Sequence, residues 1–439
     1  MIWNPAAECM PRPERERLVL ERLRDRVGWA RERVAFYREA FAAARVSPAD
    51  LRSLEDLARL PFTAKVHLRE HYPWGLFAVP RGELRRIHAS SGTRGKPTVV
   101  GYTRADLAVW REVMARSLAL GGARPGDTIQ VAYGYGLFTG GLGFHDGAEH
   151  MGCTVVPVSS GNTLRQILLL EDFRPRGLAC TPSFALHIAD AMAEAGRDPQ
   201  GVGLAYGLFG AEPWTDAMRR ELESRFGIVA TDFYGLSEVI GPGVAAECAE
   251  ARQGLHVSED HFWPEVVDPQ SGEPLPFGKE GELVLTSLTK EALPVLRYRT
   301  GDVTTLDPEP CRCGRTTVRM ARVKGRTDDM LVIKGVNVYP SQVEEALLTL
   351  PELAPHYQLV VDRTQAFPTL AVHVEPTEAV IAAWGSFEAE GAAATALRAR
   401  VAERLRAHVG LHPDIALVPP RTIPRSEGKA VRVVERRGP

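Results

Sequence analysis

The region from residue 127 to residue 235 alternates between short β-rich runs and helical runs, and this alternation restricts the fold more than any other feature of the chain. The β-rich runs read TIQVAY, CTVVPV, LACT, LAYGLF and IVATDF, and helical runs begin near Leu164, Ser183 and Thr215. Strands separated by helices pair in parallel, and the helices cover the faces of the sheet. The sequence therefore predicts an α/β fold of layered sheets and helices.

The segments on either side have different patterns. Within residues 1–60, apolar residues recur near helical spacing, which predicts surface helices. After residue 260 frequent Gly, Pro and Asp predict a turn-rich β subdomain, and from Met330 onward the pattern is compact α+β. Because 439 residues are too many for one ordinary core, we predict a large N-terminal domain over 1–325 and a small one over 326–439.

Composition excludes several classes of protein. Hydrophobic residues make up 44% and charged residues 25%, the balance of an ordinary globular protein, and the net charge is −2. A near-neutral chain has no overall positive field that would collect nucleic acid or anionic lipid. The start lacks the apolar core of a secretory signal, and no run reaches the roughly 20 apolar residues that span a bilayer. We expect a cytoplasmic protein with no nucleic-acid or membrane partner.

A loop from Ser90 to Pro97 has the composition of a phosphate-binding loop. It contains Ser90, Ser91, Gly92, Thr93, Arg94, Gly95 and Lys96. Backbone N–H groups and hydroxyls in such a loop can wrap a polyphosphate while the lysine neutralises charge. The glycine spacing and Pro97 differ from the P-loop of nucleotide triphosphatases, and a plain Gly/Ser turn is the alternative reading.

Two further motifs carry chemically useful side chains at predicted strand ends. The first runs through Asp232, Phe233, Tyr234, Gly235, Leu236, Ser237 and Glu238. Its aromatic ring, hydroxyl and carboxylate suit a base, a phosphate and Mg²⁺, although a strand end with a capping Ser also explains it. The second ends at Asp302, which could accept hydrogen bonds from ribose hydroxyls or form an Asx-turn.

Four residues form a candidate metal site. They are Cys248, His256, Cys311 and Cys313. Three thiolates and one imidazole make a closed tetrahedral set that suits structural Zn²⁺, with no position left open for catalysis. The spacing is not that of a zinc finger, so free buried thiols remain the alternative.

The order of the motifs resembles that of the adenylate-forming superfamily. The series continues after Asp302 with Gly325 to Asp329 and ends with Ser426 to Lys429. Within the superfamily the chain most resembles phenylacetate:CoA ligases, through phrases such as VAFYREAF, YGYGLFTGGLGFH, YGLSEVIGPGVAAEC and KGVNVYPSQVEE. The chain departs from the family's pattern at Asp146, where an aromatic residue is common.

This resemblance implies an AMP-forming ligase that uses ATP, Mg²⁺ and coenzyme A. An aryl acid, phenylacetate by default, would become an acyl-adenylate and then a thioester, while a mobile C-terminal lid rotates between the two steps. The alternatives are another aryl acid, transfer to a carrier-protein thiol or another acceptor, or a nucleotide-binding protein without catalysis. A homodimer is the commonest assembly for such a chain.

The resemblance also implies roles for individual residues. Lys429 would bridge the acid carboxylate and the α-phosphate, Ser237 would bind the α-phosphate, and Glu238 would hold Mg²⁺. The other nucleotide residues would be Ser90 to Lys96, Gly210, Ala211, Glu212, Asp232, Phe233, Tyr234, Gly235, Asp302 and Arg326. Lys334 and Gly335 would line the path of the thiol, and Asp328 would be the hinge. A slot for the aryl ring would be lined by Tyr135, Phe138, Gly140, Phe209 and Ile240, although these could equally belong to the core.

Overall fold

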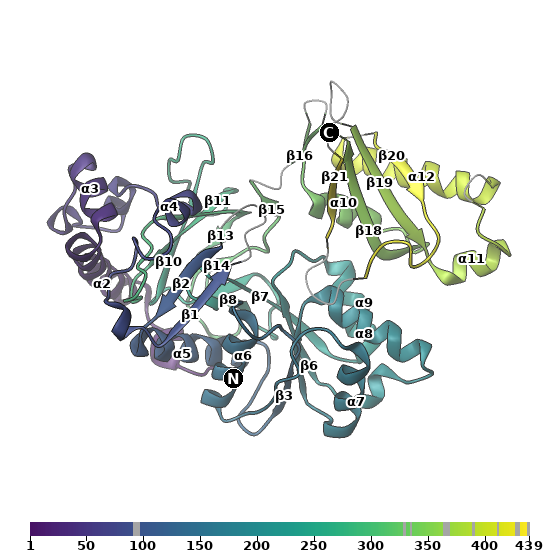
Figure 1. The fold of residues 1–439 in the computed structure, drawn as a ribbon, viewed down its shortest axis with the longest axis horizontal. Helices are drawn as coiled ribbons and strands as arrows, with labels where there is room; N and C mark the ends of the chain where they lie inside the picture. The colour runs from purple at the N-terminus through teal and green to yellow at the C-terminus, as the bar shows by residue number, and fades with distance from the viewer. Residues whose placement is uncertain are drawn as a thin grey trace.

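The computed structural model describes residues 1–90, 97–327, 331–333, 336–362, 369–388, 391–410, 412–425 and 431–436. Figure 1 shows the chain from the N-terminal helices to the C-terminal strands. The helices are α1 (Pro5–Glu8), α2 (Arg12–Arg33), α3 (Ala35–Ala44), α4 (Lys65–Glu70), α5 (Arg104–Leu120), α6 (Gly140–Met151), α7 (Thr163–Phe173), α8 (Pro182–Glu194), α9 (Asp216–Phe226), α10 (Pro340–Leu347), α11 (Glu378–Trp384) and α12 (Ala392–Val409). The helices expected within residues 1–60 are confirmed by α1 to α3.

A nine-stranded sheet forms the centre of the fold, in the order β13-β14-β9-β8-β7-β6-β5-β3-β4. Its strands are β3 (Thr128–Val131), β4 (Thr154–Val156), β5 (Gly177–Cys180), β6 (Tyr206–Gly210), β7 (Val229–Leu236), β8 (Gly241–Glu247), β9 (Leu255–Val257), β13 (Leu306–Asp307) and β14 (Arg319–Met320). Strands β4, β3, β5, β6 and β7 are parallel, as the alternating pattern predicts. Strands β8, β9, β14 and β13 continue the sheet in antiparallel pairing.

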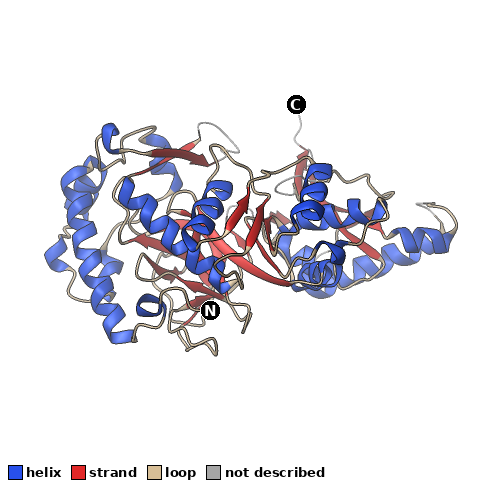
Figure 2. Ribbon diagram, turned by 90° about the horizontal axis from the view of Figure 1, so that it is seen from below, coloured by secondary structure: helices blue, strands red, loops and turns tan. Residues whose placement is uncertain are grey.

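Helices cover both faces of this sheet (Figure 2). On one face the core contains Trp110 and Met114 of α5 and Phe144 of α6. On the other face it contains residues of α7, α8 and α9, among them Phe184 and Leu222. Successive strand residues point to opposite faces, so both faces of the parallel strands are apolar and buried.

Smaller sheets complete the N-terminal part. A hairpin joins β1 (Arg86–Ser90) to β2 (Thr98–Tyr102), and a four-stranded sheet contains β10 (Phe262–Val267), β11 (Gly281–Ser287), β12 (Tyr298–Thr304) and β15 (Gly325–Arg326). The turn-rich β-structure expected after residue 260 is confirmed. Helix α3 is tied to this region by the Tyr37 hydroxyl, which donates a 3.0 Å hydrogen bond to the carbonyl of Pro294.

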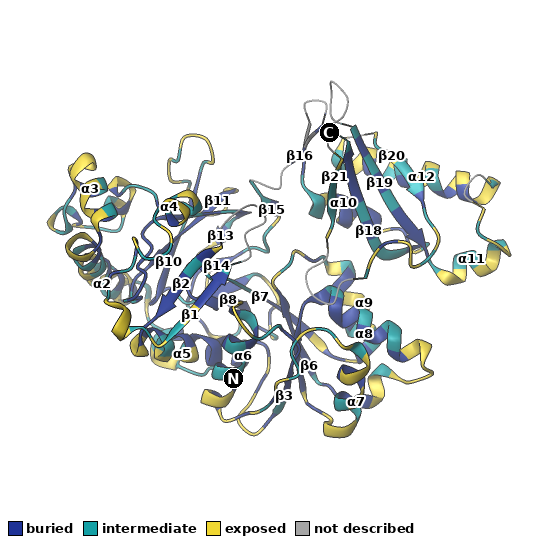
Figure 3. Ribbon diagram, viewed as in Figure 1, coloured by how far each residue is buried: buried dark blue, intermediate teal, exposed yellow. Residues whose placement is uncertain are grey.

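The C-terminal unit, residues 331–436, has a core of its own (Figure 3). It contains a hairpin of β16 (Leu331–Ile333) and β17 (Val336–Val338), and a four-stranded sheet of β18 (Leu353–Asp362), β19 (Thr369–Pro376), β20 (Asp414–Leu417) and β21 (Val433–Arg436). Helices α10 and α12 pack on this sheet through Val343, Leu397 and Val401. This is the α+β pattern expected from Met330 onward. Among the described residues, no helix is both long and apolar enough to cross a membrane.

Candidate active site and metal centre

A three-residue network joins two sheets at the carboxyl end of β7. The Tyr234 hydroxyl donates a 2.5 Å hydrogen bond to Oδ2 of Asp302, and Nη1 of Arg326 donates a 2.8 Å bond to Oδ1 of the same carboxylate. Asp302 and Arg326 are paired across β12 and β15, so the backbone fixes their separation. The structure thus brings together three residues that the sequence assigned to one nucleotide site.

Burial keeps the phenol of this network neutral. It raises the pKa of Tyr234 well above its ordinary value, and the neighbouring Asp302 carboxylate adds to that effect. A neutral phenol donates a hydrogen bond to the carboxylate, and the aromatic ring of a tyrosine can stack on a flat ligand.

Ser237 and Glu238 follow on the turn after β7. The Ser237 hydroxyl lies 3.1 Å from Oγ1 of Thr139, at the start of α6. Glu238 is buried, and its Oε1 lies 3.7 Å from Nζ of Lys65, the first residue of α4. Sequence reasoning missed Lys65 because no motif surrounds it, and only the fold places it beside the carboxylate.

The segment after β6 is held by the start of α8. Oε1 of Glu212 accepts a 2.8 Å hydrogen bond from the backbone N–H of Ser183, and Ala211 has a positive φ of 66°. A Cβ at Gly210 would lie 2.4 Å from the carbonyl oxygen of Phe233, so no larger residue fits there. The expected adenine-binding segment is therefore rigid and lies directly beside β7.

Two members of the β7 motif have structural partners of their own. Asp232 lies 3.2 Å from Nε of Arg322, and burial raises the pKa of Asp232 to about 6 despite this positive neighbour. The Phe233 ring packs against Phe144 at a centroid distance of 4.8 Å. Asp232 and Phe233 thus hold β7 in place, while Tyr234 faces Asp302.

The residues predicted for the aryl slot are not all brought together. Tyr135 packs on the core beside α6, and Gly140 begins α6 against the ring of Tyr133. Ile240 is buried in the same core, whereas the Phe138 side chain is 52% exposed. Phe209 belongs to the core on the opposite face of the sheet, where its ring packs 5.8 Å from Trp214. That packing accounts for Phe209 without a ligand.

Several predicted site residues lie outside the described part of the chain. They are Ser91, Gly92, Thr93, Gly95, Lys96, Asp328, Lys334, Gly335 and Lys429. Ser90, the last residue of β1, is paired with Thr98 at the base of the same loop. The hydroxyls of Ser90 and Thr98 are buried and have no hydrogen-bond partner among the residues that the structure describes.

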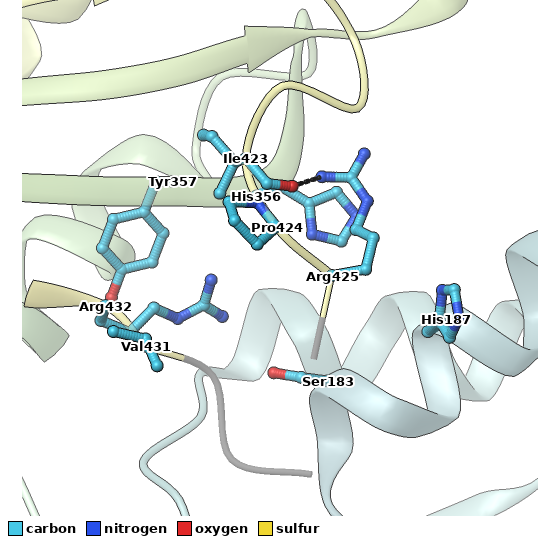
Figure 4. Close-up of a pocket in the computed structure, with 9 residues that line it drawn as sticks. All are labelled: Ser183, His187, His356, Tyr357, Ile423, Pro424, Arg425, Val431 and Arg432. Carbon is cyan, nitrogen blue, oxygen red and sulfur yellow. Dashed lines mark hydrogen bonds between the residues drawn. The ribbon is translucent and has the colours of Figure 1, made fainter. Parts of the chain in front are cut away.

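A pocket separates α8 from the C-terminal unit (Figure 4). Ser183 and His187 line it from α8, and Arg425 and Val431 line it from the two segments that flank residues 426–430. Nε2 of His356 lies 3.8 Å from Oδ2 of Asp190 across the same boundary. The pocket therefore lies next to the Glu212 segment, because Ser183 also holds Glu212.

The four predicted metal ligands converge on one point. Their ligand atoms all lie within 4.8 Å of one another, with Sγ of Cys248 and Sγ of Cys311 at 3.8 Å and Sγ of Cys313 and Nε2 of His256 at 3.5 Å. Bonds of about 2.3 Å to sulfur and about 2.1 Å to nitrogen place the ligands of a tetrahedral zinc ion roughly 3.5–3.8 Å apart. The donor set and its spacing both fit Zn²⁺.

The surroundings of these ligands are also ordered. Nδ1 of His256 lies 2.9 Å from Oγ1 of Thr317, which leaves Nε2 to face the thiols. Gly314 has a φ of 89°, so the turn after Cys313 needs a glycine. Beyond the turn, Arg315 pairs with Glu8, and the backbone N–H of Thr316 donates a 3.1 Å bond to the carbonyl of Glu8. The N-terminal segment is therefore bound by the residues that directly follow the turn with Cys311 and Cys313.

Comparison with known proteins gives a consistent assignment. A model of the AMP-binding enzyme family matches residues 81–289, and a model of the AMP-binding enzyme C-terminal domain matches residues 335–437. A phenylacetate–coenzyme A ligase of Thermus thermophilus is 54% identical over 99% of this chain and 99% of its own length.

Solved structures agree with this fold. A 2-hydroxyisobutyryl-CoA ligase in its postadenylation state, with an acyl-AMP bound, has a TM-score of 0.93 at 31% identity, over 99% of this chain and 92% of its own. The same enzyme with CoA in its thioesterification state has a TM-score of 0.73 at 32% identity over the same shares. The near-complete match to curated relatives shows that the chain belongs to the phenylacetate–coenzyme A ligase family of AMP-binding enzymes.

Proposed function

We infer that this protein activates phenylacetate with ATP and transfers the acyl group to coenzyme A. The first step forms phenylacetyl-AMP and releases pyrophosphate, and the second forms phenylacetyl-CoA and releases AMP. The observation that carries the proposal is the network of Tyr234, Asp302 and Arg326, which presents a ring and a carboxylate side by side. A ring to stack on adenine and a carboxylate to accept from ribose hydroxyls are what a bound AMP moiety requires.

Adenylation needs charge neutralisation. The acid carboxylate attacks the α-phosphorus, so two anions must approach each other, and one well-placed donor is typically worth about 3–4 kcal/mol. We propose that Lys429 supplies this cation, by resemblance to the family. The pocket between α8 and the C-terminal unit supports this role, because Arg425 and Val431 on either side of residues 426–430 line it together with Ser183, whose backbone N–H binds Glu212.

The triphosphate would lie between the β1–β2 hairpin and the turn after β7. Ser90 and the loop that follows it would bind the β- and γ-phosphates, and Ser237 the α-phosphate. The buried hydroxyls of Ser90 and Thr98 support this placement, since neither has a partner within the described part of the chain and buried polar groups are normally satisfied. Glu238 would hold Mg²⁺, which neutralises phosphate charge when bound, and the Lys65 ammonium beside Glu238 would also face the phosphates.

We propose that residues 326–439 form a lid that rotates about Asp328. The higher TM-score to the postadenylation state than to the thioesterification state supports two arrangements of one fold, with this structure in the first. After rotation, Lys334 and Gly335 would line the path of the pantetheine arm.

We propose a structural role for zinc at Cys248, His256, Cys311 and Cys313. Four protein ligands complete the coordination that structural zinc prefers, so bound Zn²⁺ would have no open position and would crosslink β9 to the loop before β14. The assembly as a homodimer and the cytoplasmic location remain predictions. Light scattering of the purified protein and fractionation of its source cells test them.

A pyrophosphate-release assay over aryl and alkyl acids, with and without CoA, tests the proposed function. We expect CoA-dependent turnover with phenylacetate, and AMP and pyrophosphate in equal amounts. Turnover with another aryl acid but not with phenylacetate would show that the substrate is that acid and not phenylacetate. Pyrophosphate release that does not depend on CoA but increases when a carrier protein is added would show that the acyl acceptor is the carrier-protein thiol.

A further inference from the structure

Tyr135 precedes α6 in the chain, and its side chain packs against one face of that helix. Gly141, His145 and Glu149 are spaced four residues apart, so they form one stripe along the helix. A Cβ at Gly141 would lie 2.9 Å from Cδ2 of Tyr135, so the tyrosine ring rests directly on the helix backbone. The ring also meets the His145 imidazole edge-on, with centroids 5.8 Å apart and an interplanar angle of 88°.

A chain of two hydrogen bonds extends from the ring along this stripe. The Tyr135 hydroxyl lies 3.2 Å from Nδ1 of His145, and Nε2 of His145 lies 3.1 Å from Oε1 of Glu149. The Glu149 carboxylate can only accept, so Nε2 of His145 donates to it, and the tautomer with its proton on Nε2 leaves Nδ1 to accept from the phenol. The phenol therefore donates to His145, and its hydroxyl is drawn toward the helix.

We propose that His145 and Glu149 are positioning residues that set acid specificity by fixing the ring of Tyr135. This inference rests on the proposed function and on the prediction from the sequence that Tyr135 borders the slot for the aryl group. With its hydroxyl held by His145, Tyr135 presents apolar ring surface to the slot and no free donor. An apolar wall favours an unsubstituted aryl group and leaves a polar substituent on the acid without a partner.

Without the His145 acceptor, the Tyr135 hydroxyl loses this hydrogen bond, and the Tyr135 ring is free to rotate. His145→Phe keeps a ring of similar size but has no nitrogen, and His145→Gln keeps an acceptor on a flexible side chain. We expect His145→Phe to raise the KM for phenylacetate about fivefold, the worth of one ordinary hydrogen bond, with little change in the KM for ATP or CoA. His145→Gln should restore part of the loss.

Tyr135→Phe removes the other partner of the same bond. We expect a similar rise in KM, and the double variant should be no worse than either single one, since both remove one interaction. The matched control is His150→Phe on the same helix, because His150 faces Trp3 and Glu112 instead of Tyr135.

The decisive readouts are the preference for phenylacetate over its para-hydroxy analogue and over hexanoate, and the affinity for phenylacetate by calorimetry. A structural role alone would lower the melting temperature and reduce kcat for all acids alike, and that result would overturn the proposal. Glu149→Gln guards against misfolding, since the Glu149 side chain is 62% exposed. Glu149→Gln should change the acid preference in the same direction as His145→Phe, but by a smaller factor.

Binding and turnover separate the two claims. If the wild-type protein binds phenylacetate but forms no thioester, the proposed function fails and the binding data still decide the role of His145. If thioester forms but the His145 and Tyr135 variants keep the wild-type acid preference, the inference alone fails. A wild-type protein that neither binds nor activates any acid overturns both.

Discussion

Asp302 accepts hydrogen bonds from Tyr234 and Arg326 on its two carboxylate oxygens, at 2.5 and 2.8 Å. The three residues come from β7, β12 and β15, which belong to two different sheets. The carboxylate thus ties the central sheet to the strand that leads into the C-terminal unit. The same group that would hold the ribose also binds the hydroxyl of the ring that would stack on the base.

Removal of the Asp302 carboxylate should lower kcat/KM for ATP more than kcat/KM for the carboxylic acid. We expect Asp302→Ala to lower kcat/KM for ATP roughly 100-fold, since hydrogen bonds to charged groups are worth about 1.5–3 kcal/mol each. Asp307→Asn is the control, because that carboxylate pairs with Arg319 near the edge of the central sheet and its side chain is half exposed. Equal losses in the two variants would place the effect in folding and not in the nucleotide site.

The metal centre should contribute to stability without entering the reaction. Cys311→Ser should abolish stoichiometric zinc, measured by elemental analysis, and lower the melting temperature by several degrees, because one ligand of a closed site is lost. Cys153→Ser, a buried cysteine outside the cluster, should leave the zinc content unchanged. Protein that is fully active and stable with no metal would contradict a structural zinc site.

The N-terminal segment should loosen together with this centre. Glu8 is held by Arg315 and Thr316, which directly follow the Cys313 turn. We therefore expect a chelator to raise amide hydrogen exchange around α1, while exchange in β5 and β6 stays slow. Unchanged exchange in α1 would show that the Glu8 contacts are independent of the metal.

Lys290 predicts a pH dependence of stability. Its ammonium is buried above the Tyr102 ring at 4.6 Å and has no hydrogen-bond partner in the described ranges of the chain. Burial lowers the pKa of Lys290 to about 8, although Asp106 and Glu238 oppose that shift. The unfolded chain therefore binds more protons than the folded one between about pH 8 and the ordinary lysine pKa of about 10.4. The free-energy cost of burying the Lys290 charge is therefore largest below about pH 8. It decreases as the pH rises through that window, so the folded protein gains stability there.

Lys290→Met removes this cost. At about pH 7 we expect the variant to be more stable than the wild type by on the order of 3 kcal/mol, and at about pH 10 most of the difference should vanish. Urea unfolding of both proteins at the two pH values measures it, and the buried tyrosines that they share cancel in the comparison. A difference independent of pH would mean that packing, and not charge, separates the two proteins.

The sequence predicted the parts of the structure that depend on local pattern. The alternation over residues 127–235 corresponds to β3 through β7 with their helices, and the four metal ligands, though far apart in the chain, converge as proposed. Motif order also placed Tyr234, Asp302 and Arg326 in one site. These successes follow from residue types that have few alternative uses.

Other contacts depend on which strand face a residue occupies, and local pattern does not reveal this. All five residues of β6 are buried, so periodicity could not separate a slot-facing Phe209 from one that packs on Trp214. Lys65 lies in no motif, and His145 ends the phrase YGYGLFTGGLGFH without a role assigned to it, so only tertiary packing reveals their contacts with Glu238 and Tyr135. The one feature of the sequence that could have pointed to these two residues was their type, a basic or an imidazole side chain near a predicted site.

The central claim is most directly tested by product analysis with Lys429→Ala. With ATP, Mg²⁺, CoA and phenylacetate, the wild type should form phenylacetyl-CoA together with equal amounts of AMP and pyrophosphate. The variant should lose acid-dependent pyrophosphate release by several orders of magnitude, but should still form thioester when supplied with synthetic phenylacetyl-AMP and CoA. Release of ADP and phosphate by the wild type, or adenylation that survives in Lys429→Ala, would contradict the account.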